Sequence, residues 1–210
     1  MSKTHTQFQL ERMALFSDAV FAIAITLLVI EIKVPDITIY GNEDLWEAVR
    51  ERWYEFFGVA LSFAVIGQFW TVHHRMFGHI TGYNNTVLWL NLHVLFWIIL
   101  MPFSSGLNSK YGNLNSAWSV YCFNISMIGL SMYFLWKYAF NPKRGFSDIT
   151  GNPVLRKRVL SRSLIMALIF LSGLLLAQFE STFASIACRA VFFLAFPAIA
   201  IINRRYTVKH

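Results

Sequence analysis

The chain has 210 residues, of which 56% are hydrophobic and 14% are charged, and its mean hydropathy is +0.50. This composition excludes an ordinary soluble domain and indicates a polytopic membrane protein, so the lipid bilayer is an expected partner. The net charge of +7 does not indicate a nucleic-acid partner, because the basic residues lie between apolar runs and not on a polar surface.

Six apolar runs are long enough, at about 20 residues each, to cross roughly 30 Å of hydrocarbon as helices. They cover residues 13–34, 53–76, 83–107, 115–139, 160–179 and 182–203. The first run is too long for the apolar part of a signal peptide, so we expect it to remain in the protein. We find no internal repeat and predict one all-α membrane domain, residues 1–210.

Two of the connections are informative. Gly41 and Asn42 favour a turn after the first span, and Asp44 could cap a helix that begins outside the membrane and runs inward. The last two spans are separated only by residues 179–181, which predicts a tight hairpin.

The basic residues predict the orientation. With the N-terminus inside, thirteen basic residues are inner and five are outer, which predicts that both termini are cytoplasmic. The inner ones are Lys3, Arg12, Arg75, Lys137, Lys143, Arg144, Arg156, Lys157, Arg158, Arg162, Arg204, Arg205 and Lys209; the outer ones are Lys33, Arg50, Arg52, Lys110 and Arg189. Most acidic residues are outer: Glu31, Asp36, Glu43, Asp44, Glu47, Glu51, Glu55 and Glu180. An acidic outer surface would concentrate cations, but hydrated outer loops explain the pattern equally well.

Asp18 lies inside the first apolar run. Between residues 13 and 30, the other polar residues are Ser17 and Thr26. A carboxylate within a span is unfavourable and needs a partner. Arg12 is six positions away, or 240° around a helix, so the two cannot pair on one face. The second and third spans offer partners for Asp18 at their inner ends, and these are His73, His74 and Asn91.

The sequence Arg12-x-x-x-Phe16-Ser17-Asp18, followed by an apolar helix, resembles the first helix of the transmembrane protein 175 family, the endosomal and lysosomal potassium channels and their prokaryotic relatives. Residues 73–77 (H-H-R-M-F) and 100–103 (L-M-P-F) give softer support. The resemblance implies a potassium channel in the plasma membrane of a prokaryote, assembled as a homotetramer around a pore that the first helix lines. It also implies a structural network at the inner helix ends, made of Arg12, Phe16, Ser17, Asp18, His73, His74 and Asn91. Whether this network is a fixed clamp or a switch remains open.

Ile23, Leu27 and Ile30 fall within about 60° of one another on a helical wheel, with Thr26 at the edge of the stripe. Such stripes are common in membrane helices and do not by themselves indicate a pore. The resemblance implies that these three residues form apolar rings at the constriction, where Thr26 matches a position at which some relatives place a hydroxyl. Ile30 replaces the leucine of the family pattern and keeps its volume. Apolar rings would select potassium over sodium only modestly, by partial dehydration.

Other classes of function have weaker support. The chain lacks a TVGYG-like filter, and its six histidines show no H-x-x-x-H or H-E-x-x-H spacing, so we expect no metal, no cofactor other than permeant potassium, and no enzymatic activity. The first alternative is a small proton- or cation-coupled secondary transporter that uses Asp18 and the inner histidines. The second is a membrane redox protein with a bis-histidine haem. Arg189, inside the last span, is expected to extend its side chain outward or to pair with Glu180 of a neighbouring subunit.

Overall fold

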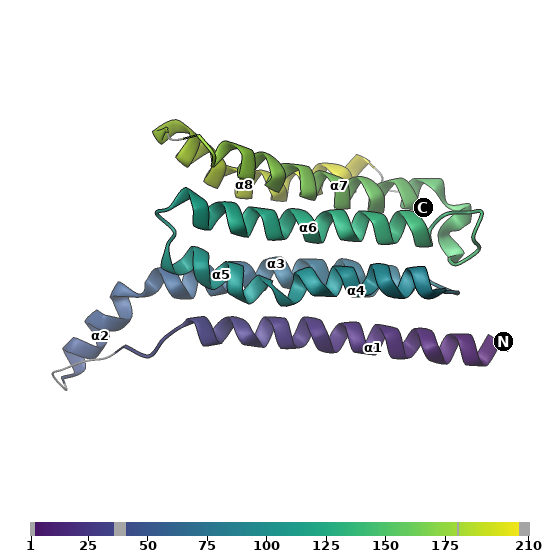
Figure 1. The fold of residues 1–210 in the computed structure, drawn as a ribbon, viewed down its shortest axis with the longest axis horizontal. Helices are drawn as coiled ribbons and strands as arrows, with labels where there is room; N and C mark the ends of the chain where they lie inside the picture. The colour runs from purple at the N-terminus through teal and green to yellow at the C-terminus, as the bar shows by residue number, and fades with distance from the viewer. Residues whose placement is uncertain (1–2, 36–40, 180, 206–210) are drawn as a thin grey trace.

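Long helices run back and forth along one axis and stack in layers (Figure 1). The structure is a computed structural model that describes residues 3–35, 41–179 and 181–205, so Asp36, Glu180 and Lys209 of the charge analysis lie outside it. Helix α1 (Lys3–Leu27) forms one edge, and α3 (Trp53–Phe77), α4 (Asn85–Ile99) and α5 (Met101–Lys110) form the next layer. Helix α6 (Asn115–Ala139) follows, and α7 (Pro153–Leu176) and α8 (Thr182–Arg205) complete the stack. The all-α prediction is therefore confirmed.

Five helical segments among the described residues are long and apolar enough to cross a membrane. They are His5–Glu31, Trp53–Phe77, Asn85–Lys110, Asn115–Ala139 and Pro153–Leu176, and they match the first five predicted spans. Helix α8 covers the predicted sixth span and has 24 residues, but it contains Pro197 and is not one of the five. The beginning of α1 and the end of α8 lie at the same end of the bundle (Figure 1).

Local sequence explains where several helices begin. The side chain of Asn84 accepts a hydrogen bond from the backbone N–H of Val87, 3.1 Å away, and so caps α4. Asn152 caps α7 in the same way through Leu155, and Pro153 occupies the first turn, where its missing N–H removes no helical hydrogen bond.

Two predicted elements differ in the structure. The predicted second helix is divided into the spanning α3 and a short amphipathic α2 (Asn42–Glu51), which is angled away from the bundle (Figure 1). The N-cap residue of α2 is Gly41 and not the predicted Asp44. The third span is divided at Leu100 into α4 and α5, because Pro102 is accommodated in the first turn of a new helix. A four-residue 3₁₀ helix, η1 (Leu28–Glu31), continues α1, and a second, η2 (Asp148–Gly151), precedes α7.

Helix α6 is the centre of the protein. Its large side chains Tyr121, Met132 and Trp136 are fully buried, and it packs against α4 and α5 on one side and α7 on the other. Gly129 permits the close approach to α7, since an added Cβ would lie 3.1 Å from both Ala167 and the Ser163 carbonyl. By contrast, among the long helices in the described part of the chain, α1 makes its main contacts with α3, α4 and α5.

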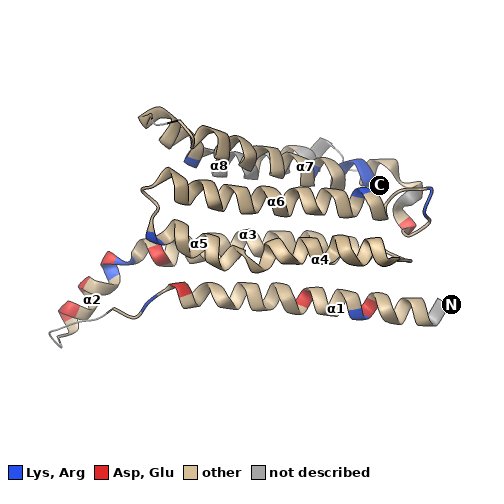
Figure 2. Ribbon diagram, viewed as in Figure 1, with Lys and Arg blue, Asp and Glu red and all other residues tan. Residues whose placement is uncertain are grey.

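The charged residues lie mainly at the two ends of the bundle, as Figure 2 shows. Acidic residues are concentrated on α2, and basic residues near the beginning of α7 at the opposite end. Asp18 is an exception within the apolar length of α1.

Candidate functional site

Helix α1 has one covered and one uncovered face. The covered face repeats at intervals of three and four residues and comprises Leu10, Met13, Ser17, Phe21, Ala24 and Leu28. The opposite face contains Ile23, Leu27 and Ile30, whose side chains are 56%, 39% and 67% exposed. Thr26 is exposed beside them, and its hydroxyl donates to the Ile23 carbonyl over 2.9 Å. The four predicted pore residues therefore share the face of α1 that the protomer leaves uncovered.

A buried chain of hydrogen bonds ties α1 to α4 and α3. Asn91 Nδ2 donates to Ser17 Oγ over 2.9 Å, and Asn91 Oδ1 lies 2.8 Å from His73 Nε2. Because an amide oxygen only accepts, His73 Nε2 must carry the proton of this bond. Ser17 Oγ donates in turn to the carbonyl of Met13, 2.9 Å away. These hydrogen bonds fix the rotation of α1 about its own axis relative to its neighbours.

Aromatic rings enclose this chain. The imidazole of His73 stacks on Phe77 with ring centroids 4.4 Å apart, and Phe21 of α1 and Trp136 of α6 lie 5.4 and 5.6 Å away. The hydrogen-bonded chain is thus buried within an apolar cluster, where the loss of any hydrogen bond would strongly lower the stability of the fold.

Asp18 belongs to a second, more exposed cluster. Trp70 Nε1 donates to Asp18 Oδ1 over 2.9 Å, and His74 Nδ1 lies 3.5 Å from Oδ2. Trp70 was absent from the predicted partners, although it lies one helical turn before His74 and their rings are 5.3 Å apart. An indole donor four residues before a histidine on the same face was the available signal in the sequence.

Arg12 and Phe16 lie outside both clusters. The guanidinium of Arg12 donates to Gln9 Oε1 over 3.4 Å and lies 5.9 Å from the centre of the Phe8 ring. Phe16 is exposed on the same side of α1 as Ile23. Within one protomer, therefore, five of the seven predicted residues form two adjoining clusters. One cluster contains Ser17, Asn91 and His73, and the other contains Asp18 and His74 together with Trp70. Arg12 extends along its own helix, and its angular separation from Asp18 prevents the two side chains from pairing on one face.

Among the described residues, no group of three or more histidine, cysteine, aspartate or glutamate side chains could hold a metal ion. His73 and His74 face different clusters, and His93 Nε2 accepts from Trp97.

These features define a multi-pass helical membrane protein whose first helix is covered on one side by the protomer, and known proteins share its fold. Residues 12–102 match the family described as the endosomal/lysosomal potassium channel TMEM175. A potassium channel of Chamaesiphon minutus is 34% identical over 142 residues, which cover 66% of this chain and 70% of that protein. The crystal structure of a lysosomal potassium-selective channel TMEM175 homolog from Chamaesiphon minutus has a TM-score of 0.75 and 28% identity, and covers 93% of this chain and 98% of that one. The chain therefore belongs to the TMEM175 family.

A potassium channel of Streptomyces collinus is 38% identical over 100 residues, which cover 48% of each chain. In that comparison the chain spans about half the length of its relative.

Proposed function

We propose that the protein is a potassium channel in which four copies assemble around an axis lined by α1. The observation that supports this most directly is the uncovered face of α1, where Ile23, Leu27 and Ile30 lie opposite the side packed against the protomer. Relatives named potassium channels support the choice of ion. The proposal includes α8 as a sixth span, both termini in the cytoplasm, and insertion in the plasma membrane of a prokaryote.

The geometry of α1 gives dimensions for the constriction. Leu27 lies four residues after Ile23 along the α-helix, and Ile30 lies three residues further on, within η1. At rises of 1.5 and 2.0 Å per residue, the three rings would span roughly 12 Å. An ion crossing this sleeve loses part of its water shell, and apolar side chains offer no ligands in return. Potassium gives up water more readily than sodium, which favours potassium, but the selectivity is modest because the rings offer neither ion a ligand. Dewetting of the same rings closes the pathway.

The inner clusters set the direction of these rings. The chain through Ser17, Asn91 and His73 and the contacts of Asp18 hold α1 against α3 and α4 from two sides. A pore-lining side chain needs such a supporting shell, because a rotation of α1 would turn the rings away from the axis. Asp18 acts in this proposal as a clamp.

Cysteine crosslinking tests the assembly. With Cys122 and Cys188 replaced, Leu27→Cys should form disulfide-linked dimers between subunits under mild oxidation, because the proposed axis brings copies of residue 27 together. Leu168→Cys, exposed on α7 far from α1, is the matched control and should remain monomeric. Equal crosslinking at both positions, or modification of residue 27 only by lipid-soluble reagents, would contradict the axis.

Bilayer recording tests the constriction. Ile23→Ala should raise the conductance and bring the potassium and sodium permeabilities closer together, because a wider sleeve leaves both ions more water. The measurement is the reversal potential with potassium on one side and sodium on the other, with Leu168→Ala as control. If only Leu27 or Ile30 substitutions shift it, the constriction lies elsewhere on α1; if none does, α1 does not line the pore.

A coupled transporter is the second candidate, because Asp18 is partly exposed and lies within 3.5 Å of His74, as a proton relay would require. A transporter would show saturable, proton-dependent flux and no unitary currents. The same recordings separate the two mechanisms.

A further inference from the structure

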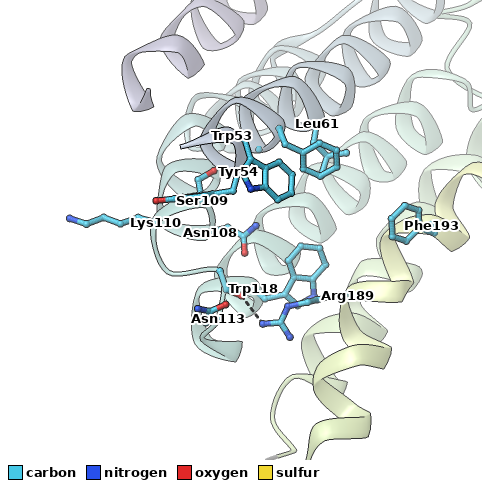
Figure 3. Close-up of a pocket in the computed structure, with 13 residues that line it drawn as sticks. Trp53, Tyr54, Leu61, Asn108, Ser109, Lys110, Asn113, Trp118, Arg189 and Phe193 are labelled. Atoms are coloured by element: carbon cyan, nitrogen blue, oxygen red, sulfur yellow. Dashed lines mark hydrogen bonds between the residues drawn. The ribbon is translucent and has the colours of Figure 1, made fainter. Parts of the chain in front are cut away.

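A cavity of about 610 Å³ opens between α3, the end of α5, the beginning of α6 and α8 (Figure 3). It lies at the end of the bundle opposite the N-terminus. Trp53 and Tyr54 of α3 lie at its mouth, and Arg189 and Phe193 of α8 face it from the other side. Lys110 of α5 also lines the mouth, but its side chain extends outward and its ammonium lies 5.3 Å from the centre of the Tyr111 ring. The cavity therefore separates α8 from α3.

The cavity is positively charged. Its lining includes Lys110 and Arg189, and none of the described residues that line it is acidic. The guanidinium of Arg189 donates to the carbonyls of Ser185 and Gly112, each 2.7 Å away, and to Asn115 Oδ1 at 3.4 Å. These acceptors are neutral, so they orient the guanidinium without balancing its charge. A cation inside an apolar helix is unfavourable unless an anion accompanies it.

Polarity changes along the cavity in the order of a phospholipid. Lys110 and Arg189 lie toward the end of the bundle, and Phe193 lies one turn further along α8, about 6 Å deeper. On the facing wall, Tyr54 near the start of α3 is followed by Phe57 and then Leu61, each about one turn further into the span. Aromatic residues at the mouth match the interfacial belt of membrane proteins. A phosphate would meet the cations, and an acyl chain would meet the apolar walls.

We propose that this cavity binds an anionic phospholipid, with its phosphate on Arg189 and one acyl chain between Leu61 and Phe193, and that the flexible Lys110 side chain turns inward to meet the same phosphate. The bound lipid fills the space between α8 and the α3–α5 layer. It therefore supplies contact between helices that the protein alone does not provide there.

Native mass spectrometry of the detergent-purified protein tests the proposal with phosphatidylglycerol and phosphatidylcholine as probes. The wild-type protein should retain phosphatidylglycerol in preference to phosphatidylcholine. Arg189→Gln and Lys110→Gln should each weaken phosphatidylglycerol binding roughly tenfold, since each removes a charge-assisted contact. Arg50→Gln, which removes an exposed charge from α2 outside this cavity, is the control and should bind like the wild type. Equal binding by all three variants, or equal retention of both lipids, would overturn the proposal.

Two further experiments test whether the bound anion is a lipid or free phosphate, and whether a loss of binding could result from a change in the fold. Inorganic phosphate in large excess should not displace the lipid; displacement would assign the cavity to free phosphate. Arg189→Gln also removes hydrogen bonds to Ser185 and Gly112, so Leu61→Trp provides a variant that leaves the cation in place and fills the chain end of the cavity. In detergent without added lipid it should unfold at the same temperature as the wild type, and it should not bind phosphatidylglycerol. Undiminished binding by a correctly folded Leu61→Trp variant would refute the acyl-chain site.

Discussion

Replacing Asn91 by leucine should destabilise the protein strongly, because Asn91 links α1 and α3 through two buried hydrogen bonds. The change leaves the His73 Nε2–H without an acceptor in an aromatic enclosure, which costs about 1–3 kcal/mol. Loss of the bond to Ser17, which keeps its contact with Met13, costs about 0.5–1.5 kcal/mol more. The expected total is about 1.5–4.5 kcal/mol. At about 2–4 °C per kcal/mol for a chain of this size, Tm should fall by roughly 3–18 °C.

Thermal unfolding in detergent, followed by tryptophan fluorescence, measures this fall. Asn85→Leu is the matched control, since Asn85 is exposed at the first position of the same helix. The double variant His73→Leu with Asn91→Leu should lose at least about 1 kcal/mol less than the sum of the single variants, because it removes the orphaned donor together with its partner. An Asn91→Leu protein that unfolds with the Asn85→Leu control, or strictly additive single changes, would show that the buried chain does not stabilise the inner ends.

Two other substitutions have expected outcomes in the same assay. Asp18→Ala should lower the free energy of unfolding by about 1 kcal/mol, because it removes the acceptor of the partly exposed Trp70 indole. Asp18→Asn keeps an oxygen at this position and should recover most of the loss. Equal Tm values for the two variants would contradict this role. Gly129→Ala should cost about 1–3 kcal/mol, since its Cβ would lie 3.1 Å from backbone atoms of α7, while Gly67→Ala, where an added Cβ meets nothing within 4 Å, should be neutral or stabilising. A tolerated Gly129→Ala would mean that α6 and α7 separate more easily than their packing indicates.

Hydropathy was sufficient to predict the first five spanning segments but not their continuity, and the sixth span stays a prediction. An apolar run indicates that its residues are buried in the membrane or in the protein, but it does not indicate whether they form one continuous helix or two. The division at Leu100 was visible only as Pro102, two residues on, because proline is compatible with the first turn of a new helix inside a run that stays apolar.

Prediction of the site was limited by the direction of side chains. The helical wheel grouped Ile23, Leu27 and Ile30, but both sides of α1 are largely apolar, so the covered side could be identified only from the packing of α3 and α4. Trp70 was left out of the predicted network, although its N–H is a donor that a nearby carboxylate can use. Arg12 was placed in the network through resemblance alone; within one protomer its side chain follows its own helix, and its place in the network stays a prediction.

The change of helix type at Leu28 determines where the charge of Glu31 points. With 3.0 residues per turn, residues three apart lie directly above one another, so Glu31 follows the buried Leu28 and turns toward α5. Its carboxylate occupies the space that a side chain on Gly106 would need. An unbroken α-helix would turn Glu31 away from that line by about 60°. In the proposed tetramer, the four Glu31 carboxylates would thereby turn away from the axis, so Glu31 would not form an acidic ring of the kind with which other cation channels attract cations.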